Sequence, residues 1–137
     1  MRTYLDSSVL LRHLLGQPGA LDFVGVDHPV SSVLTRVECR RTLDRLRMKA
    51  GLGYDELLRR LDACEAMLAT VALAQLDPVV MERAGGPLPV PLGTLDALHL
   101  ATALLWKEQD GGEFRFATHD RALADAARGF GLAVVGV

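Results

Sequence analysis

Short apolar segments alternate along this chain with longer segments of helical spacing, and this alternation constrains the fold more than any other feature of the sequence. Short, mostly apolar strands that are each followed by a helix are typical of a parallel sheet buried on both faces. The sequence therefore predicts an α/β fold with a mostly parallel sheet of four or five strands and helices on both faces. The expected strands lie at residues 3–5, 30–32, 71–74, 114–117 and 132–135, and the expected helices at about 7–15, 33–48, 54–68, 78–84, 95–107 and 120–129, with one further helical turn at 20–25.

Several helix starts are predicted from side chains that can accept hydrogen bonds from the first free backbone N–H groups. Ser7 or Ser8, Ser32, Thr94 and Asp120 stand at such positions. The helix that follows Ser32 is apolar on two sides, which predicts that it packs against two neighbours or against the sheet and a partner. Leu34, Val37 and Met48 form one of these sides, and Cys39, Leu43 and Leu46 form the other.

The size and composition of the chain predict a single domain over residues 1–137. A chain of this length that is 50% hydrophobic and 23% charged can bury its own core. No apolar run reaches the roughly 18 residues that cross a bilayer, and the N-terminal segment lacks a signal-peptide pattern, so a cytoplasmic protein is expected. Cys39 and Cys64 are expected as buried apolar residues rather than metal ligands. The net charge of −2 neither favours nor excludes a nucleic-acid partner.

Four acidic residues stand where the predicted fold would bring them to one edge of the sheet. Asp6 follows the first strand, and Asp120 lies just past the fourth. Asp96 is in the first turn of the long apolar helix before that fourth strand, and Glu38 is one and a half turns into the helix after the second strand. Ligands of open parallel sheets bind beyond the carboxyl ends of the strands, where the following helices begin. We therefore expect the four carboxylates to converge.

Each of these acids also has a purely structural explanation that the sequence leaves open. Asp6 and Asp120 can cap helices, and Asp96 can interact favourably with a helix dipole. The fourth acid can pair with Arg41 or Arg45 on its own helix surface. These explanations are independent of one another, whereas a single site at one edge of the sheet accounts for all four positions.

Four carboxylates in one cleft repel one another, and a bound cation relieves that repulsion. The set holds only oxygen donors, which favours Mg²⁺ or Mn²⁺ over zinc. Such an ion retains water molecules, and one of these can attack a phosphodiester in line. His99, one turn after Asp96 on the same helix face, is expected as a core residue or as a residue that supports a metal ligand, with a general base as the alternative. His119 is open between a junction residue and an RNA contact.

The chain resembles the PIN-domain family, and within it the branch of VapC toxins. The similar segments are YLDSSVLL with Asp6, VSSVLTRVECRRTL with Glu38, LDALHLATALL with Asp96 and FATHDRALADAARGFGL with Asp120, and together they span nearly the whole sequence. The resemblance implies an endoribonuclease in which these four acids surround one or two ions of Mg²⁺ or Mn²⁺. It also implies a homodimer that is neutralised by a small VapB-like antitoxin.

The same resemblance implies that Thr118, and Ser7 or Ser8, hold the carboxylates or the water molecules of the metal. One loop departs from the family, since the stretch GGPLPVPLGT before Asp96 carries no charge where a basic residue near the scissile phosphate would be expected. Contact with RNA is then left to arginines elsewhere. The candidates are Arg36, Arg40, Arg115 and Arg121.

Two other functions remain as alternatives. A PIN-like interaction module that has lost its activity would be expected to lack some of the acids, whereas this chain has the full set. A Mg²⁺-dependent phosphohydrolase with Asp6 as its nucleophile would usually carry a second Asp two residues later, where this chain has Ser8.

Overall fold

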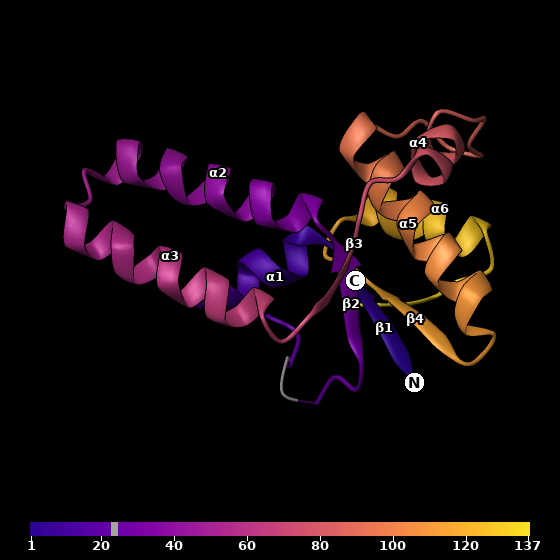
Figure 1. Ribbon diagram of the computed structural model, residues 1–137, viewed down its shortest axis with the longest axis horizontal. Helices are drawn as coiled ribbons and strands as arrows, with labels where there is room; N and C mark the ends of the chain where they lie inside the picture. Colours follow the sequence, from indigo (N-terminus) through magenta and orange to yellow (C-terminus); the bar gives the residue numbers. More distant parts are fainter. Residues whose placement is uncertain (23–24) are drawn as a thin grey trace.

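The structure, a computed structural model, describes residues 1–22 and 25–137. Within these residues one parallel sheet of five strands runs through the centre of the molecule in the order β3-β2-β1-β4-β5 (Figure 1). The strands are β1 (Arg2–Leu5), β2 (Pro29–Ser32), β3 (Ala72–Ala74), β4 (Phe114–Ala117) and β5 (Ala133–Val135). Every neighbouring pair is parallel. The α/β fold with a parallel sheet is thus confirmed.

Helices cover both faces of this sheet, as predicted. Figure 1 shows α1, α2 and α3 on one side, where α2 and α3 form a long antiparallel pair, and α4, α5 and α6 on the other. Their bounds are α1 (Ser7–Leu14), α2 (Leu34–Ala50), α3 (Tyr54–Leu68), α4 (Pro78–Ala84), α5 (Thr94–Asp110) and α6 (Arg121–Gly129). The bounds of α3, α4 and β4 are those expected from the sequence.

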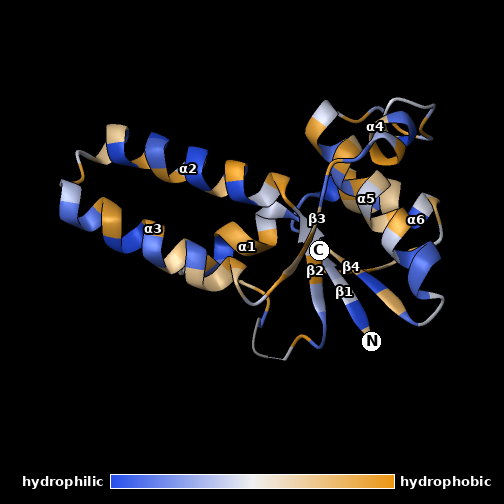
Figure 2. Ribbon diagram, in the orientation of Figure 1, coloured by the Kyte–Doolittle hydropathy of each residue, from blue (hydrophilic) through white to orange (hydrophobic). Residues whose placement is uncertain are grey.

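The core forms because neighbouring strand residues point to opposite faces of the sheet. Tyr4 and Phe116 pack beneath α5 and α6, whereas the next residue of each strand, Leu5 and Ala117, packs beneath α1, α2 and α3. The apolar colours of Figure 2 run along most of α5, in agreement with its eight buried residues between Ala97 and Leu104. This helix is therefore central, and its first turn is held firmly at the edge of the sheet.

Three details of the helix starts differ from the expectation. The cap of α1 is Asp6, not Ser7 or Ser8, because the Asp6 carboxylate reaches two free N–H groups of the first turn. Thr94 is the first residue of α5 rather than its cap, and Gly93 takes that position without a side-chain hydrogen bond. The Ser32 hydroxyl does accept from the N–H of Leu34, as expected, although Val33 occupies the cap position of α2.

The helical turn expected at residues 20–25 is wrong where the structure describes it, since residues 20–22 and 25 are not helical; the rest of that segment lies outside the described residues. Its Gly and Pro neighbours at 16–19 favour turns over a helix. The described part of the chain also has no helix that combines the length and the apolar character needed to span a bilayer.

The two apolar sides of α2 have different surroundings. Cys39 and Leu43 are buried beneath α1 and α3, and burial raises the pKa of the Cys39 thiol to about 12, so it behaves as an apolar core group. On the other side, Val37 is 58% and Met48 70% exposed. The first side thus shares a core cluster with Leu5 and Ala117 of the sheet. The second side is divided, since Val37 and Met48 are open to solvent whereas Leu34 packs against the cluster that contains Leu98.

Candidate active site

Asp6 stands at the end of the central strand and is almost completely buried, with 3% of its surface exposed. Its Oδ1 accepts hydrogen bonds from the backbone N–H groups of Ser8 (2.7 Å) and Val9 (3.3 Å) and from the Ser8 hydroxyl (2.5 Å). Its Oδ2 accepts from the hydroxyl of Thr118 (2.6 Å). Asp6 therefore does cap α1, one of the structural explanations left open by the sequence, and its carboxylate is fixed from both sides.

Thr118 and Ser8 also connect Asp6 to the start of α6. The Thr118 hydroxyl donates to Asp6 and accepts from the backbone N–H of Asp120 (3.0 Å). The Ser8 hydroxyl likewise donates to Asp6 and accepts from the N–H of His119 (2.9 Å). The junctions after β1 and β4 are thus hydrogen-bonded to each other, as their adjacent positions in the sheet allow.

Glu38 points from α2 toward this edge and does not pair with the arginines of its own helix. Its Oε2 accepts from the hydroxyl of Ser7 (2.9 Å), and its Oε1 contacts Nε2 of His99 (2.6 Å). The other ring nitrogen of His99, Nδ1, lies 2.7 Å from the hydroxyl of Tyr4. Arg41 instead pairs with Asp44. The surface pairing considered for Glu38 with Arg41 or Arg45 does not occur.

Asp96 has the most informative electrostatics of the four acids. Burial raises the pKa of its carboxyl above the ordinary value, and the negative charges of Asp120, Asp6 and Glu38 raise it further, while His99 opposes the shift. No described residue donates a hydrogen bond to the Asp96 carboxylate. The four acids, which come from β1, α2, α5 and the start of α6, therefore act on one another electrostatically.

Asp120 caps α6 through a hydrogen bond from the N–H of Leu123 to its Oδ1 (2.9 Å). It is exposed, unlike Asp6. Asp6 and Asp120 thus have the capping roles considered for them, and Asp96 lies in the first turn of α5, where it can interact with the helix dipole. Only for Glu38 does the purely structural explanation fail.

The donor set fits a hard divalent ion by its chemistry. All four groups are carboxylates, and the pKa of Asp96 is raised by burial and by the repulsion that a cation would relieve. Among the described residues, however, no three His, Cys, Asp or Glu side chains lie close enough together to hold a metal ion. The expected convergence of the four acids into one set of metal ligands is therefore not formed in the structure.

His99 and Tyr4 are site residues whose roles the sequence did not reveal. His99 is 1% exposed and Tyr4 is fully buried, with its ring stacked on Phe116 at a centroid distance of 5.3 Å. Tyr4 and His99 are 95 residues apart in the sequence, and His99 and Glu38 are 61 residues apart. The one local signal was the position of His99 one turn after Asp96, which indicated a core residue or a residue that supports a metal ligand, with a general base as the alternative.

The arginines expected to contact RNA lie in different surroundings. Arg36 and Arg40 both pair with Glu65 of α3. Arg115 is partly buried in β4, where it reaches the hydroxyl of Thr3. Arg121, in the first turn of α6 beside Asp120, is exposed.

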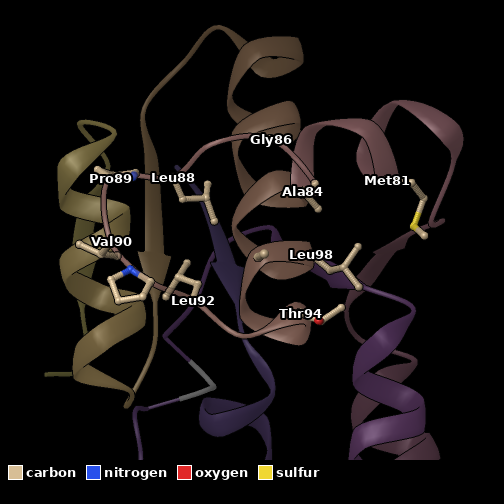
Figure 3. A pocket seen from close by; sticks show the side chains of 12 residues that line it. Met81, Ala84, Gly86, Leu88, Pro89, Val90, Leu92, Thr94 and Leu98 are labelled. Carbon is tan, nitrogen blue, oxygen red and sulfur yellow. The ribbon is translucent and has the colours of Figure 1, made fainter.

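The Gly- and Pro-rich loop 85–93 lies beside α5 and lines a cavity of about 580 Å³ with α4 (Figure 3). In Figure 3, Leu88, Val90 and Leu92 of the loop lie on one side of α5, whereas Leu98 points to the other side, where it packs with residues of α4, and Thr94 stands at the start of the helix. The uncharged loop therefore packs as an apolar wall next to the helix that carries Asp96.

The fold is a parallel five-stranded sheet with helices on both faces, and acidic side chains lie at its carboxyl edge. These two features define a class of small α/β domains built around a carboxylate site. The model of the PIN domain matches residues 3–129, and the chain belongs to this family. Over 136 residues the chain is 37% identical to Ribonuclease VapC46 of Mycobacterium tuberculosis, and the match covers 96% of this chain and 95% of that protein. The resemblance to VapC-like members of the PIN family is confirmed.

Proposed function

We propose that this protein is a metal-dependent endoribonuclease and the toxin of a VapBC-type pair. The observation that carries the proposal is the set of hydrogen bonds that joins Asp6 to the start of α6 at Asp120 through Thr118, and Glu38 to the start of α1 through Ser7. The pKa of Asp96, which is raised by burial and by the charges of Asp120, Asp6 and Glu38, agrees with this arrangement at the carboxyl edge of the sheet. The similarity to a protein named a ribonuclease adds the substrate class.

The ligands in this proposal are Asp6, Glu38, Asp96 and Asp120, with Mg²⁺ or Mn²⁺ as the ion. When bound, such an ion neutralises the carboxylates, activates a water molecule and stabilises the charge that develops on the phosphate during in-line attack. Asp96 is the acid best suited to bind the ion directly, since no described residue donates a hydrogen bond to it.

The chain's own residues hold the acids in place for this reaction. Thr118 and Ser8 fix the two oxygens of Asp6, and Ser7 donates to Glu38. Oδ1 of Asp6 already accepts three hydrogen bonds, whereas its Oδ2 and each oxygen of Glu38 have one partner. Because each carboxylate oxygen has two lone pairs, these three oxygens can still bind a metal ion. The hydrogen bonds therefore orient both acids and leave Oδ2 of Asp6 and the Glu38 carboxylate able to coordinate. They also disfavour the alternative phosphohydrolase, in which Asp6 would have to act as a free nucleophile.

Arg121 is the strongest of the four candidates for phosphate contact, because it is exposed and adjacent to Asp120. Arg36 and Arg40 would have to share or give up their contact with Glu65 to bind RNA, and Arg115 is partly enclosed. The exposed apolar side of α2, with Val37 and Met48, offers a surface for the proposed antitoxin or a second subunit. A cytoplasmic location fits this activity.

The decisive experiment measures RNA cleavage with and without Mn²⁺ or Mg²⁺ and compares the unaltered protein with Asp96→Asn. Asp96 is preferable to Asp6 because it does not cap a helix, so its replacement leaves the local hydrogen bonds of the fold in place. Asp125→Asn is the matched control, since Asp125 is an exposed acid of α6 that pairs with Arg128. We expect Asp96→Asn to lose cleavage and Asp125→Asn to retain it, with both variants folded.

Two results would contradict the proposal. Full cleavage by a folded Asp96→Asn variant would remove Asp96 from the reaction. If the unaltered protein cleaves no RNA and calorimetry detects no bound Mn²⁺, an interaction module without catalytic activity is the better explanation.

A further inference from the structure

A buried chain of side chains joins the centre of the sheet to Glu38. It runs from the hydroxyl of Tyr4 in β1 to Nδ1 of His99 in α5 (2.7 Å), and from Nε2 of His99 to Oε1 of Glu38 in α2 (2.6 Å). We propose that Tyr4 and His99 are positioning residues that set the orientation of the Glu38 carboxylate for metal binding. This inference rests on the proposed function of Glu38 as a metal ligand.

The direction of the hydrogen bonds follows from the chemistry of the groups. An ionised carboxylate can only accept, so Nε2 of His99 carries a hydrogen and donates it to Glu38. In the tautomer that donates from Nε2, Nδ1 has a lone pair and accepts from the hydroxyl of Tyr4. Tyr4 thus selects the tautomer of His99 that can hold Glu38, in the way that partners of metal-site histidines commonly do.

The surroundings leave these side chains little freedom. His99 is 1% exposed and Tyr4 fully buried, so water cannot easily replace either donor. The ring of Tyr4 stacks on Phe116 and meets the ring of His99 edge to face at a centroid distance of 5.9 Å. Packing in the core therefore fixes the ring of His99, and the hydrogen bond from Nε2 of this ring holds the Glu38 carboxylate in place.

The two oxygens of Glu38 have different donors, which fixes the plane of its carboxylate. Ser7 holds Oε2 and His99 holds Oε1. Arg36 and Arg40, on the same helix, are engaged by Glu65 and do not compete for Glu38. Loss of the His99 donor would leave the carboxylate free to rotate about Oε2, so the entropy lost on binding a metal ion would increase.

The first test measures the affinity for Mn²⁺ by calorimetry, a property that is independent of RNA cleavage. His99→Leu removes the donor and keeps an apolar side chain in the core, whereas His99→Gln retains an N–H that can reach Glu38. We expect His99→Leu to bind Mn²⁺ roughly 10-fold to 100-fold more weakly, as is usual when a partner of a metal ligand is lost, and His99→Gln to recover most of the affinity. Leu104→Ala, also in the core part of α5, controls for a general loss of stability and is expected to leave the affinity unchanged.

The second test asks whether Tyr4 acts through His99. Tyr4→Phe is expected to weaken Mn²⁺ binding in the unaltered protein and to have no further effect in the His99→Leu background, since contacting residues of one network are not additive. Cleavage at saturating Mn²⁺ should recover more fully in these variants than cleavage at limiting Mn²⁺. If His99→Leu does not fold, His99→Gln and Tyr4→Phe carry the test.

The outcomes separate this inference from the proposed function. If the unaltered protein binds Mn²⁺ and cleaves RNA but folded His99→Leu and Tyr4→Phe variants bind Mn²⁺ equally well, the positioning role is refuted and the nuclease stands. Equal losses in His99→Leu and Leu104→Ala would also refute it. If the unaltered protein neither binds Mn²⁺ nor cleaves RNA, the nuclease function and the positioning role are both refuted.

Discussion

Thr118→Val removes one hydroxyl group that connects two of the four acids. Thr118 is fully buried at the end of β4, and its hydroxyl donates to Asp6 (2.6 Å) and accepts from the N–H of Asp120 (3.0 Å). Valine has nearly the same shape, so the substitution leaves no cavity and changes only the hydrogen bonding. We expect a large loss of stability for a change of a single atom.

The size of the loss can be worked out from these two contacts. A hydrogen bond to a charged group contributes about 1.5–3 kcal/mol, and a backbone N–H left without a partner costs at least about 1 kcal/mol. The expected decrease in the free energy of unfolding is therefore about 2.5–4 kcal/mol. Asp6 keeps its three donors from Ser8 and Val9, so the helix start itself should remain formed.

Urea denaturation of the metal-free protein at neutral pH measures this loss, with Thr35→Val as the control. Thr35 is equally buried, but its hydroxyl donates to the uncharged carbonyl of Ser32 (2.7 Å), so its replacement should cost only about 1 kcal/mol. Thr118→Ser keeps the hydroxyl and should recover most of the stability. If the two valine variants lose the same free energy within about 0.5 kcal/mol, the charged contact with Asp6 does not have the role argued here.

Three further substitutions test other parts of the argument. Gly136→Ala would place its Cβ against the backbone carbonyl oxygen of Thr118 at a φ of +101° and should lower the free energy of unfolding by about 2–4 kcal/mol in urea denaturation. Gly131→Ala, with a φ of +76° and open space around it, should cost only about 1 kcal/mol, and equal costs would exclude the close contact as the cause. The raised pKa of Asp96 means that this group stabilises the metal-free fold fully below its ordinary pKa of 3.8 and progressively less as the pH rises through the raised folded value. Asp96→Asn should therefore be more stable than the unaltered protein at pH 7 by about 0.5 kcal/mol, a value discounted for partial exposure. A less stable variant would contradict the argument that burial and the neighbouring charges destabilise the ionised carboxyl. Arg121→Ala should reduce the slope of log RNA affinity against log salt by about one, with Arg128→Ala as the control, and an unchanged slope would exclude Arg121 from phosphate contact.

The fold was predictable because hydrophobic spacing is a local signal. The pattern of residues 54–68 predicts α3 with its observed bounds, and the apolar α5 is central, as expected for a helix that is apolar nearly all round. The helix caps were less predictable, because several polar residues stand together at each start. Asp6, Ser7 and Ser8 all suit the cap of α1, and the backbone angles rather than the sequence select Asp6.

The residues that support the acids could be predicted only in part, and the reason is distance along the chain. Ser8 is two residues from Asp6, within the reach of local reasoning, and Thr118 was expected through the family resemblance. The contacts of Glu38 come from Ser7 and His99, which are 31 and 61 residues away. No periodicity or spacing indicates such contacts, since they arise only when α1, α2 and α5 are packed around β1.

The position of each acid in its helix explains why Glu38 alone is held only by side chains. Asp6 and Asp120 are at helix caps, and Asp96 is in a first turn, so free N–H groups and the positive end of a helix dipole offset part of their mutual repulsion. Glu38 is in the second turn of α2, where the backbone N–H groups already bond within the helix. Its carboxylate can be held near the other acids only by side chains, and Ser7 and His99 supply them. Three acids stand at helix starts, where their placement is part of the fold, and the fourth is held by side chains alone. Substitutions around Glu38 should therefore lower the metal affinity at a smaller cost in folding stability than substitutions that disrupt the caps.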